Sequence, residues 1–482
     1  MKLIYGIDAK PPFGKTVVFA FQQMISIMAA TLLVPMLMSM METGNGTFLY
    51  FDPAAALLGA GAGSIVYMLF TKRRSPVFLG SSFTFLGAYT AVLGNNYGYL
   101  GVLIGIALAG LVYVVLALII KFAGSAWVNK LMPAVIAGPI VTIIGLSLSS
   151  TATGWMSTNG GSDYNLIGIL CGLVTFLTIV IVSTKGKKMM KLIPFILGIG
   201  AGYMVALIST LLGLAFEVEY MQVLSFQSFS ETFNPVTFES FFRLPQFTFL
   251  SAIGEIKDAG KFPLDGAAIL NIALTFIPIA VVELAQHIAD HKNLSTIVEK
   301  DLITDPGLHT TLLGDGVGSI VGGLFGGAAN TTYGESIGCV ALSKNASTRS
   351  ILFAAIGCIA LAFFSPFVAF INSIPKCVMG GACVAMYGFI AVSGLQMLKQ
   401  VDLSKNNNLF VVASILVIGI GGLTINIGTN KLTGGPLFQL TALATALIVG
   451  IIVNAITNSG KAEELEGEED VVGASRTEDE TV

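Results

Sequence analysis

Long apolar runs separated by short polar links dominate this chain. A helix that crosses a bilayer needs about 20 apolar residues, and runs of about that length recur in two series. They lie near residues 16–40, 54–71, 100–120, 131–150, 165–183 and 192–214, then 266–289, 309–328, 350–373, 377–398, 408–426 and 435–457. A shorter run broken by glycine follows the second full run of each series, at 77–93 and at 328–342. The pattern predicts an all-α polytopic membrane protein with fourteen segments in a 7+7 arrangement.

An odd number of segments in each half requires the second half to be inserted upside down, which makes an inverted repeat. The distribution of basic residues supports this count when the N-terminus is placed in the cytoplasm. Of the 25 Lys and Arg residues, 20 then lie inside, as the positive-inside rule requires. The five outside are Arg243, Lys257, Lys261, Lys376 and Lys431. We therefore expect both termini in the cytoplasm and the longest outer loop at 215–265.

Composition agrees with this prediction and excludes a soluble globule. Hydrophobic residues make up 54% of the chain and charged residues only 11%, whereas soluble domains carry about 25% charged residues. The sequence pI of 5.7 reflects nine acidic residues within 461–482. We expect residues 458–482 to form a disordered cytoplasmic tail and residues 1–15 a cytoplasmic N-terminus.

The two glycine-broken runs are the strongest pointer to a binding site. They read PVFLGSSFTFLGAY (76–89) and FGGAANTTYGESIGCVAL (325–342). Each predicts a short extended stretch followed by a half-helix that begins near Thr84 or Glu335. Such paired discontinuous segments form the substrate site in transporters built from inverted repeats. The competing explanation is that these glycines serve close helix packing alone; the matched placement and the intramembrane Glu335 favour a site.

A second polar cluster lies in the run that begins at 266. Helical spacing puts Glu283, Gln286, His287 and Asp290 on one face. His287 and His291 are four residues apart, which suits a metal site, but no third ligand is evident. We therefore expect His291 to be a solvated residue at the helix end and expect no metal. For Asp290, a simple position at the membrane boundary remains an alternative.

The chain lacks the signatures of energy-coupled or enzymatic chemistry. No phosphate-binding loop followed by Lys and Ser or Thr occurs, and neither a G-x-S-x-G elbow nor an H-E-x-x-H motif is present. The five cysteines lie in or beside apolar runs without metal-ligand spacing. We expect no enzyme activity, no cofactor and no nucleic-acid partner.

Several stretches resemble the nucleobase/ascorbate transporter family, and most closely its bacterial uracil permeases. They are PPFGKTVVFAFQQMISIMAATLLVP (11–35), GSSFTF (80–85), KDLITDPGLH (300–309), NTTYGESIG (330–338) and IPKCVMGGACVAMYG (374–388). NTTYGE is the most specific, because uracil-type members carry glutamate where purine-type members tend to have glutamine. The resemblance implies uptake of uracil or a related nucleobase by proton symport through alternating access, in the bacterial inner membrane.

The same resemblance implies a division into two domains and names the binding residues. A core domain would comprise 16–121 and 266–373, and a gate domain, which pairs two copies in a homodimer, would comprise 131–214 and 374–457. Phe83 would contribute backbone and ring contacts and Tyr387 an apolar wall. Gly334 and Glu335 would bind the base through main chain and carboxyl.

Two positions depart from the family pattern. AQHIAD (285–290) places Gln286 where the substrate-binding glutamate belongs, and Ser336 stands where Asn is usual. An amide offers one donor and one acceptor to the uracil edge, as a protonated carboxyl does, whereas an ionised carboxylate only accepts. We therefore expect Gln286 to preserve base recognition without titrating. Proton coupling would then lie at Glu335 or Glu283, with Asp290 or His287 as a relay.

Several alternatives remain open from the sequence. The chain could be a nucleobase facilitator or exchanger without proton coupling, or it could carry xanthine. It could transport anions on the same 7+7 plan, although Glu335 argues against an anion site. A membrane receptor or an embedded enzyme is a further class. The enzyme would need a nucleophile and base pair or a metal set, and none is found in the sequence.

Overall fold

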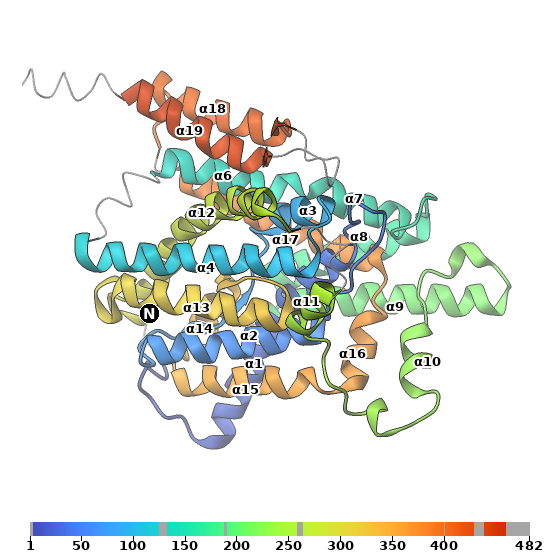
Figure 1. Cartoon of the computed structure of the whole chain (residues 1–482). Helices are drawn as coiled ribbons and strands as arrows, with labels where there is room; N and C mark the ends of the chain where they lie inside the picture. Colours follow the sequence, from blue (N-terminus) through green and yellow to red (C-terminus); the bar gives the residue numbers. More distant parts are fainter. Residues whose placement is uncertain are drawn as a thin grey trace, which may run out of the picture.

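The computed structural model describes residues 3–124, 133–187, 190–257, 264–399, 401–428 and 438–458, and it is mostly helical (Figure 1). Among these residues, eight helical stretches are long and apolar enough to cross a membrane. They are α1 (Phe13–Ser39), α2 (Pro53–Phe70), α4 (Gly98–Ala123), α6 with α7 (Ala134–Ser147 and Ser149–Thr158), α8 (Leu166–Lys185), α9 (Pro194–Ala215), α12 (Gly266–Val298) and α17 (Lys376–Leu398). The expected acidic tail lies outside the described residues apart from its first residue.

The remaining predicted runs also coincide with helices. These are α13 (Leu308–Gly326), α15 (Thr348–Ala362) with α16 (Ser365–Asn372), α18 (Asn406–Ile420) and α19 (Ala442–Asn458). Two ends differ from the prediction, because residues 425–427 and 438–440 form the paired strands β3 and β4 rather than helix. The runs at 131–150 and 350–373 each divide into two helices, with breaks at Leu148 and at Phe363–Phe364.

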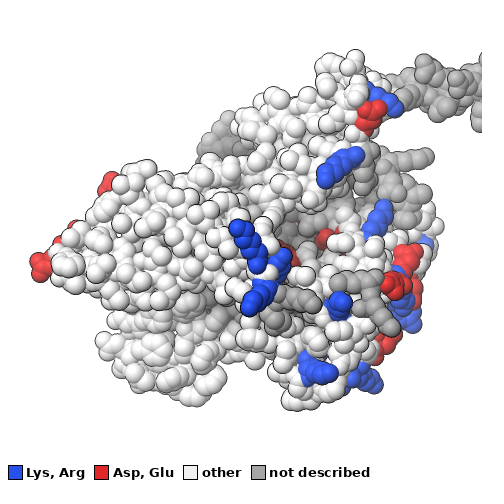
Figure 2. Space-filling model, turned by 180° about the vertical axis from the view of Figure 1, so that it is seen from behind, with Lys and Arg blue, Asp and Glu red and all other residues white. Residues whose placement is uncertain are grey.

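The surface of the helices is apolar where a bilayer would surround it. Large exposed side chains recur along α4, α8 and α9, among them Leu111, Leu118, Leu170, Leu177 and Leu211. Figure 2 shows most of the charged side chains between the middle and one edge of this face, a few acidic side chains at the opposite edge, and a broad uncharged surface between them. This distribution fits a multi-pass membrane protein, since contact with lipid removes the cost of exposing these side chains to water.

Both glycine-broken segments form the predicted strand and half-helix. β1 (Leu79–Ser81) precedes α3 (Leu86–Gly94), and β2 (Asn330–Thr332) precedes α14 (Gly334–Ser343). The two strands pair antiparallel with Gly80 opposite Thr331. Their backbone groups therefore satisfy one another in the interior, where unpaired groups would be costly.

Side chains from neighbouring elements hold the β1–β2 pair in place. The Asn330 amide donates to the Gly59 carbonyl on α2 (3.0 Å), and the Tyr333 hydroxyl donates to the Ser81 carbonyl (2.6 Å). Gly80 is required here, because a Cβ atom at that position would collide with the Tyr333 ring. These contacts fix the β1–β2 pair relative to α2 and to the start of α14.

The helices pack in two groups. In the first, α13 packs against α2 and α4, α15 against α1 and α2, and α12 against α4. In the second, α17 packs against α6, α7 and α8, α8 against α9, and α18 against α19 and α6. Figure 1 shows α2, α4, α13 and α15 side by side, with α18 and α19 at the opposite side of the bundle. Elements of the two groups meet around α3, α12 and α14.

The segment between α9 and α12 covers the N-terminal ends of two helices. It contains α10 (Gln227–Phe233) and α11 (Thr248–Lys257). Arg243 pairs with Asp52, the N-cap of α2 (2.9 Å). The Glu255 carboxyl accepts from the backbone N–H groups of Tyr99 and Leu100 at the start of α4 (3.0 and 2.9 Å). Carboxylates are favourable at these positive helix ends.

Candidate functional site

Two cavities meet at the junction between β1 and α3. The carboxyl cavity has a volume of about 430 Å³ and is lined by Gln286, Asp290 and Glu335 among others. The neutral cavity has a volume of about 610 Å³, and none of the described residues that line it is charged.

The carboxyl cavity has one polar wall and one apolar wall. The polar wall comes from the β1–α3 junction, α12 and the β2–α14 junction: Ser82, Phe83, Thr84, Gln286, Ala289, Asp290, Thr331, Tyr333, Gly334 and Glu335. The facing wall comes from α6, α9 and α17: Val141, Phe195, Met386, Phe389, Ile390, Ser393 and Met397. A cavity with an apolar wall and a few convergent polar groups suits a small planar polar molecule.

The start of α14 presents backbone donors to this cavity. Gly334 and Glu335 are its first two residues, and the first N–H groups of a helix have no intrahelical acceptor. The open surroundings of Gly334 leave room for a ligand, since a Cβ there would meet no atom within 4 Å. The positive helix end and the Glu335 carboxyl therefore act on the same space.

Gln286 and Asp290 reach the cavity from α12, one helical turn apart. The Asp290 carboxylate accepts a hydrogen bond from the Thr332 hydroxyl (3.0 Å) and so ties α12 to β2. Among the described residues no partner is found for the Gln286 amide. Its donor and acceptor are thus available to a ligand.

Glu283 and His287 do not line the cavity. Glu283 is buried behind its wall, where Oε1 accepts from the Ser82 hydroxyl at 3.4 Å. His287 Nδ1 lies 2.7 Å from Asp315 Oδ2, and Nε2 lies 3.1 Å from the Thr311 hydroxyl. The face predicted on α12 is therefore divided, with Gln286 and Asp290 at the cavity and the other two residues turned into the helix bundle.

The prediction that His291 is solvated at a helix end is wrong. The helix continues to Val298, and His291 is fully buried with Nε2 2.8 Å from the Tyr67 hydroxyl. The apolar run ends before this residue, but the helix continues past it, and the Tyr67 hydroxyl on α2 gives the His291 ring a buried partner. Among the described residues no group of three His, Cys, Asp or Glu side chains could hold a metal ion.

Tyr387 stands behind Phe83 rather than in the cavity wall. The two rings contact edge to face, with centroids 6.2 Å apart and planes at 75°. Phe83 itself lines both cavities. The apolar wall expected from Tyr387 is instead supplied by its neighbours on α17.

Ser336, which follows Glu335 on α14, has a structural role. Its hydroxyl accepts from the Gln23 amide on α1 (2.5 Å) and from the backbone N–H of Phe78 (3.0 Å). Ser336 is completely buried. It therefore joins α1, the chain before β1 and α14 directly behind the site.

Sequence reasoning missed several residues of this region. Asp315, the partner of His287, could have been found because an ionisable residue within an apolar segment is a candidate by default. Ser82 and Thr331 lie in motifs that the sequence already singles out. The apolar wall from α6, α9 and α17 carried no signal, since Val, Phe and Met are common throughout these helices.

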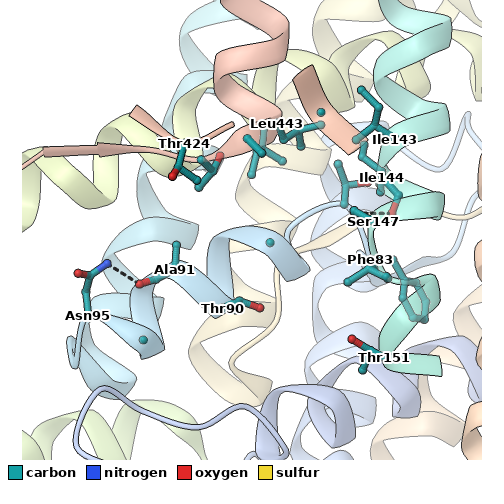
Figure 3. Close-up of a pocket in the computed structure, with 18 residues that line it drawn as sticks. Phe83, Thr90, Ala91, Asn95, Ile143, Ile144, Ser147, Thr151, Thr424 and Leu443 are labelled. Carbon is teal, nitrogen blue, oxygen red and sulfur yellow. Dashed lines mark hydrogen bonds between the residues drawn. The ribbon is translucent and has the colours of Figure 1, made fainter. Parts of the chain in front are cut away.

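The neutral cavity is lined by hydroxyl, amide and aliphatic groups (Figure 3). Thr90 and Asn95 come from α3 and its end, Ser147 and Thr151 from α6 and α7, and Leu443 from α19. Phe83 reaches it from the β1–α3 junction.

Comparison with known sequences finds close relatives over nearly the whole chain. The profile described as the permease family matches residues 14–428. The uracil permease of Bacillus caldolyticus is 35% identical over 457 residues, covering 94% of this chain and 95% of that protein. The uracil permease of Bacillus subtilis (strain 168) is 34% identical, covering 96% and 97%. That of Escherichia coli (strain K12) is 31% identical, covering 93% and 94%.

Solved structures with a similar fold are membrane transporters. The transmembrane domain of a cyanobacterium bicarbonate transporter, BicA, gives a TM-score of 0.54 at 13% identity, covering 94% of this chain and 99% of that one. The murine Slc26a9 anion transporter in the inward-facing state gives 0.59 at 11% identity, covering 94% and 69%. At these identities the likeness concerns the fold alone.

Proposed function

The chain belongs to the permease family, and from this we propose that it transports uracil or a closely related nucleobase. The family consists of membrane transporters rather than enzymes. The similarity extends over nearly the full length of three uracil permeases. Uracil uptake is therefore the function that the chain's relatives favour most.

The structural observation that carries this proposal is that Gln286 and the start of α14 line the same cavity. The Gln286 amide and the backbone N–H groups of Gly334 and Glu335 border one cavity. Uracil presents imide donors beside carbonyl acceptors, so an amide can match one donor and one acceptor. The aromatic and aliphatic wall opposite suits the faces of a flat ring.

The roles of the site residues follow from these positions. We assign base recognition to Gln286, Gly334 and Glu335 and ring contact to Phe83, with Tyr387 acting through its contact with Phe83. The lack of a charged side chain among the described residues of the neutral cavity also favours an uncharged substrate over an anion. For sulfate or bicarbonate, a cation would be expected along this path.

We also propose that transport is coupled to protons. The residue that binds the coupling proton is assigned by its position relative to the carboxyl cavity. Among the four proposed residues, Glu335 and Asp290 line the carboxyl cavity, whereas Glu283 and His287 do not. We assign the coupling proton to Glu335, with Asp290 as its relay. Glu283 is linked to the carboxyl cavity only indirectly, through the hydroxyl of Ser82, which lines the cavity. Gln286 cannot titrate, so a facilitator without coupling is the second candidate.

The proposed architecture has fourteen segments, inverted halves and two moving domains. The packing groups described above support a core of α1–α4 with α12–α16 and a gate of α6–α9 with α17–α19. Alternating access would move one group against the other around the carboxyl cavity. We further propose a homodimer through the gate, residence in the cell's inner membrane, and cytoplasmic termini.

Ligand-induced thermal stabilisation of the purified protein tests the substrate assignment. A ligand that binds the native state alone raises the unfolding temperature. We expect stabilisation by uracil and none by ascorbate or sulfate, with xanthine weaker than uracil. Stabilisation by sulfate alone would contradict a nucleobase site.

A further inference from the structure

The two cavities follow one another along the same two helices. On α12, Ile279 lines the neutral cavity and Gln286 the carboxyl cavity, a separation of roughly 10 Å at 1.5 Å per residue. On α6, Val141 borders the carboxyl cavity and Ile143 the neutral cavity. Because α12 and the stretch formed by α6 with α7 are each long and apolar enough to cross a membrane, we infer that the two cavities follow one another across it.

Among the described residues, only Phe83 and Thr84 line both cavities. We propose that the Phe83 ring, supported by Tyr387, is the movable side-chain barrier between them, with the smaller Thr84 side chain beside it, so that removal of the ring joins the cavities into one continuous aqueous path. This inference rests on the proposed transport function and adds a barrier role to the substrate contact assigned to Phe83.

The backbone at this barrier is held in place, which leaves the ring as its movable part. The Thr84 N–H donates to the Ser82 hydroxyl (3.3 Å), which in turn donates to Glu283 on α12 (3.4 Å). The Leu86 N–H donates to the Phe83 carbonyl (3.0 Å). Residues 82–86 are therefore fixed to α12 and to α3, whereas the Phe83 side chain is held by packing.

The barrier is shared between the two packing groups. Phe83 lies beside α3 and α12, whereas Tyr387 belongs to α17. A movement of one group of helices relative to the other would break the contact between the Phe83 and Tyr387 rings. The barrier therefore depends on a contact that the proposed transport motion changes.

Passage of urea, a small neutral solute, tests the barrier in proteoliposomes. We expect Phe83→Ala to raise urea permeability, followed by light scattering, at least roughly tenfold above that of the unaltered protein. Phe389→Ala is the matched control, because it removes an equal ring from a residue that lines the carboxyl cavity alone. Equal urea flux in a monodisperse Phe83→Ala protein and in Phe389→Ala would overturn the inference.

Further variants keep the test decisive if Phe83→Ala does not fold. Tyr387→Ala should leak urea, whereas Tyr387→Phe, which retains the supporting ring, should not; Phe83→Leu should leak to an intermediate degree. Equal tightness of Tyr387→Ala and Tyr387→Phe, with no leak in Phe83→Leu, would refute the barrier. Uracil uptake by the unaltered protein is measured separately, so a urea leak without uracil uptake would contradict the substrate assignment and leave the barrier standing.

Discussion

Gln286 is the residue to which we assign recognition of the substrate's polar edge. It borders the carboxyl cavity as an uncharged side chain with one acceptor and one pair of donor hydrogens. A glutamate at this position would need a proton to offer the same pattern. Recognition by Gln286 is therefore expected to be independent of pH, and any dependence must come from Glu335 or its neighbours.

Replacing Gln286 with Glu tests this reasoning. Ionisation of the new carboxylate removes a donor and repels a uracil carbonyl, and an unmatched buried polar group costs about 1–3 kcal/mol. We expect uracil binding by Gln286→Glu to weaken roughly 10-fold to 100-fold as pH rises through the titration of the introduced carboxyl. Uracil titrations across a pH series measure this change. A pH-independent affinity in the variant would contradict the assigned contact.

Removal of the titrating group tests the coupling assignment. We expect Glu335→Gln to abolish the stimulation of uracil uptake by a proton gradient, and Asp290→Asn to slow it, because both residues border the cavity. Glu283→Gln should retain stimulation, since the new amide oxygen can still accept from Ser82. Uptake with and without an imposed gradient is the measurement. If all three variants and Gln286→Glu keep the unaltered pH dependence, coupling does not reside in this cluster.

Residue positions were predictable from the sequence only in part. Helical spacing on one face identified Gln286 and Asp290, and the NTTYGE motif identified Glu335. The same spacing could not separate Glu283 and His287 from the cavity, because their partners Ser82 and Asp315 come from distant segments. Nor could it show that His291 is buried against Tyr67.

At the scale of elements, close backbone contact between α2 and α13 helps to hold the β1–β2 pair in position. Gly59 faces Gly322, and a Cβ on Gly59 would lie 2.5 Å from the Gly322 carbonyl oxygen. Because the Asn330 amide donates to the Gly59 carbonyl, any separation of these helices also disturbs β2. Small residues at helix contacts within membranes generally permit this approach.

Gly59→Ala is expected to destabilise the protein. Overpacking a tight contact costs about 1–3 kcal/mol, so we expect a lower unfolding temperature in detergent. Gly338→Ala on α14 is the control, because its added methyl group would meet no atom within 4 Å. Equal unfolding temperatures for the two variants would show that the α2–α13 contact is not tight.

The broken segments were the best-predicted elements. Glycine interruptions at matched places in the two halves indicated both extended stretches, and the half-helices begin within two residues of the predicted positions. Their mutual pairing as β1 and β2 could not be read from the sequence, since three-residue strands carry too little pattern. The breaks near Leu148 and Phe363 were missed, although the serines that flank Leu148 and the Ser365–Pro366 pair after the second break were available signals.

At the scale of the whole molecule, the proposed inverted repeat predicts opposite sides for two matching positions. Asn95 follows the half-helix α3, and Lys344 follows the half-helix α14. We expect Asn95→Cys to react with an impermeant thiol reagent from outside intact cells, and Lys344→Cys to react only after the membrane is opened. The native cysteines are buried and provide a low background. Labelling of both positions from the same side would contradict the inverted repeat.

Uptake of radiolabelled uracil into proteoliposomes, with and without an inward proton gradient, tests the central claim most directly. We predict saturable uptake that unlabelled uracil abolishes and sulfate leaves unchanged, with a gradient increasing it if Glu335 carries the coupling proton. No saturable uracil uptake by monodisperse reconstituted protein under either condition would contradict the proposed function.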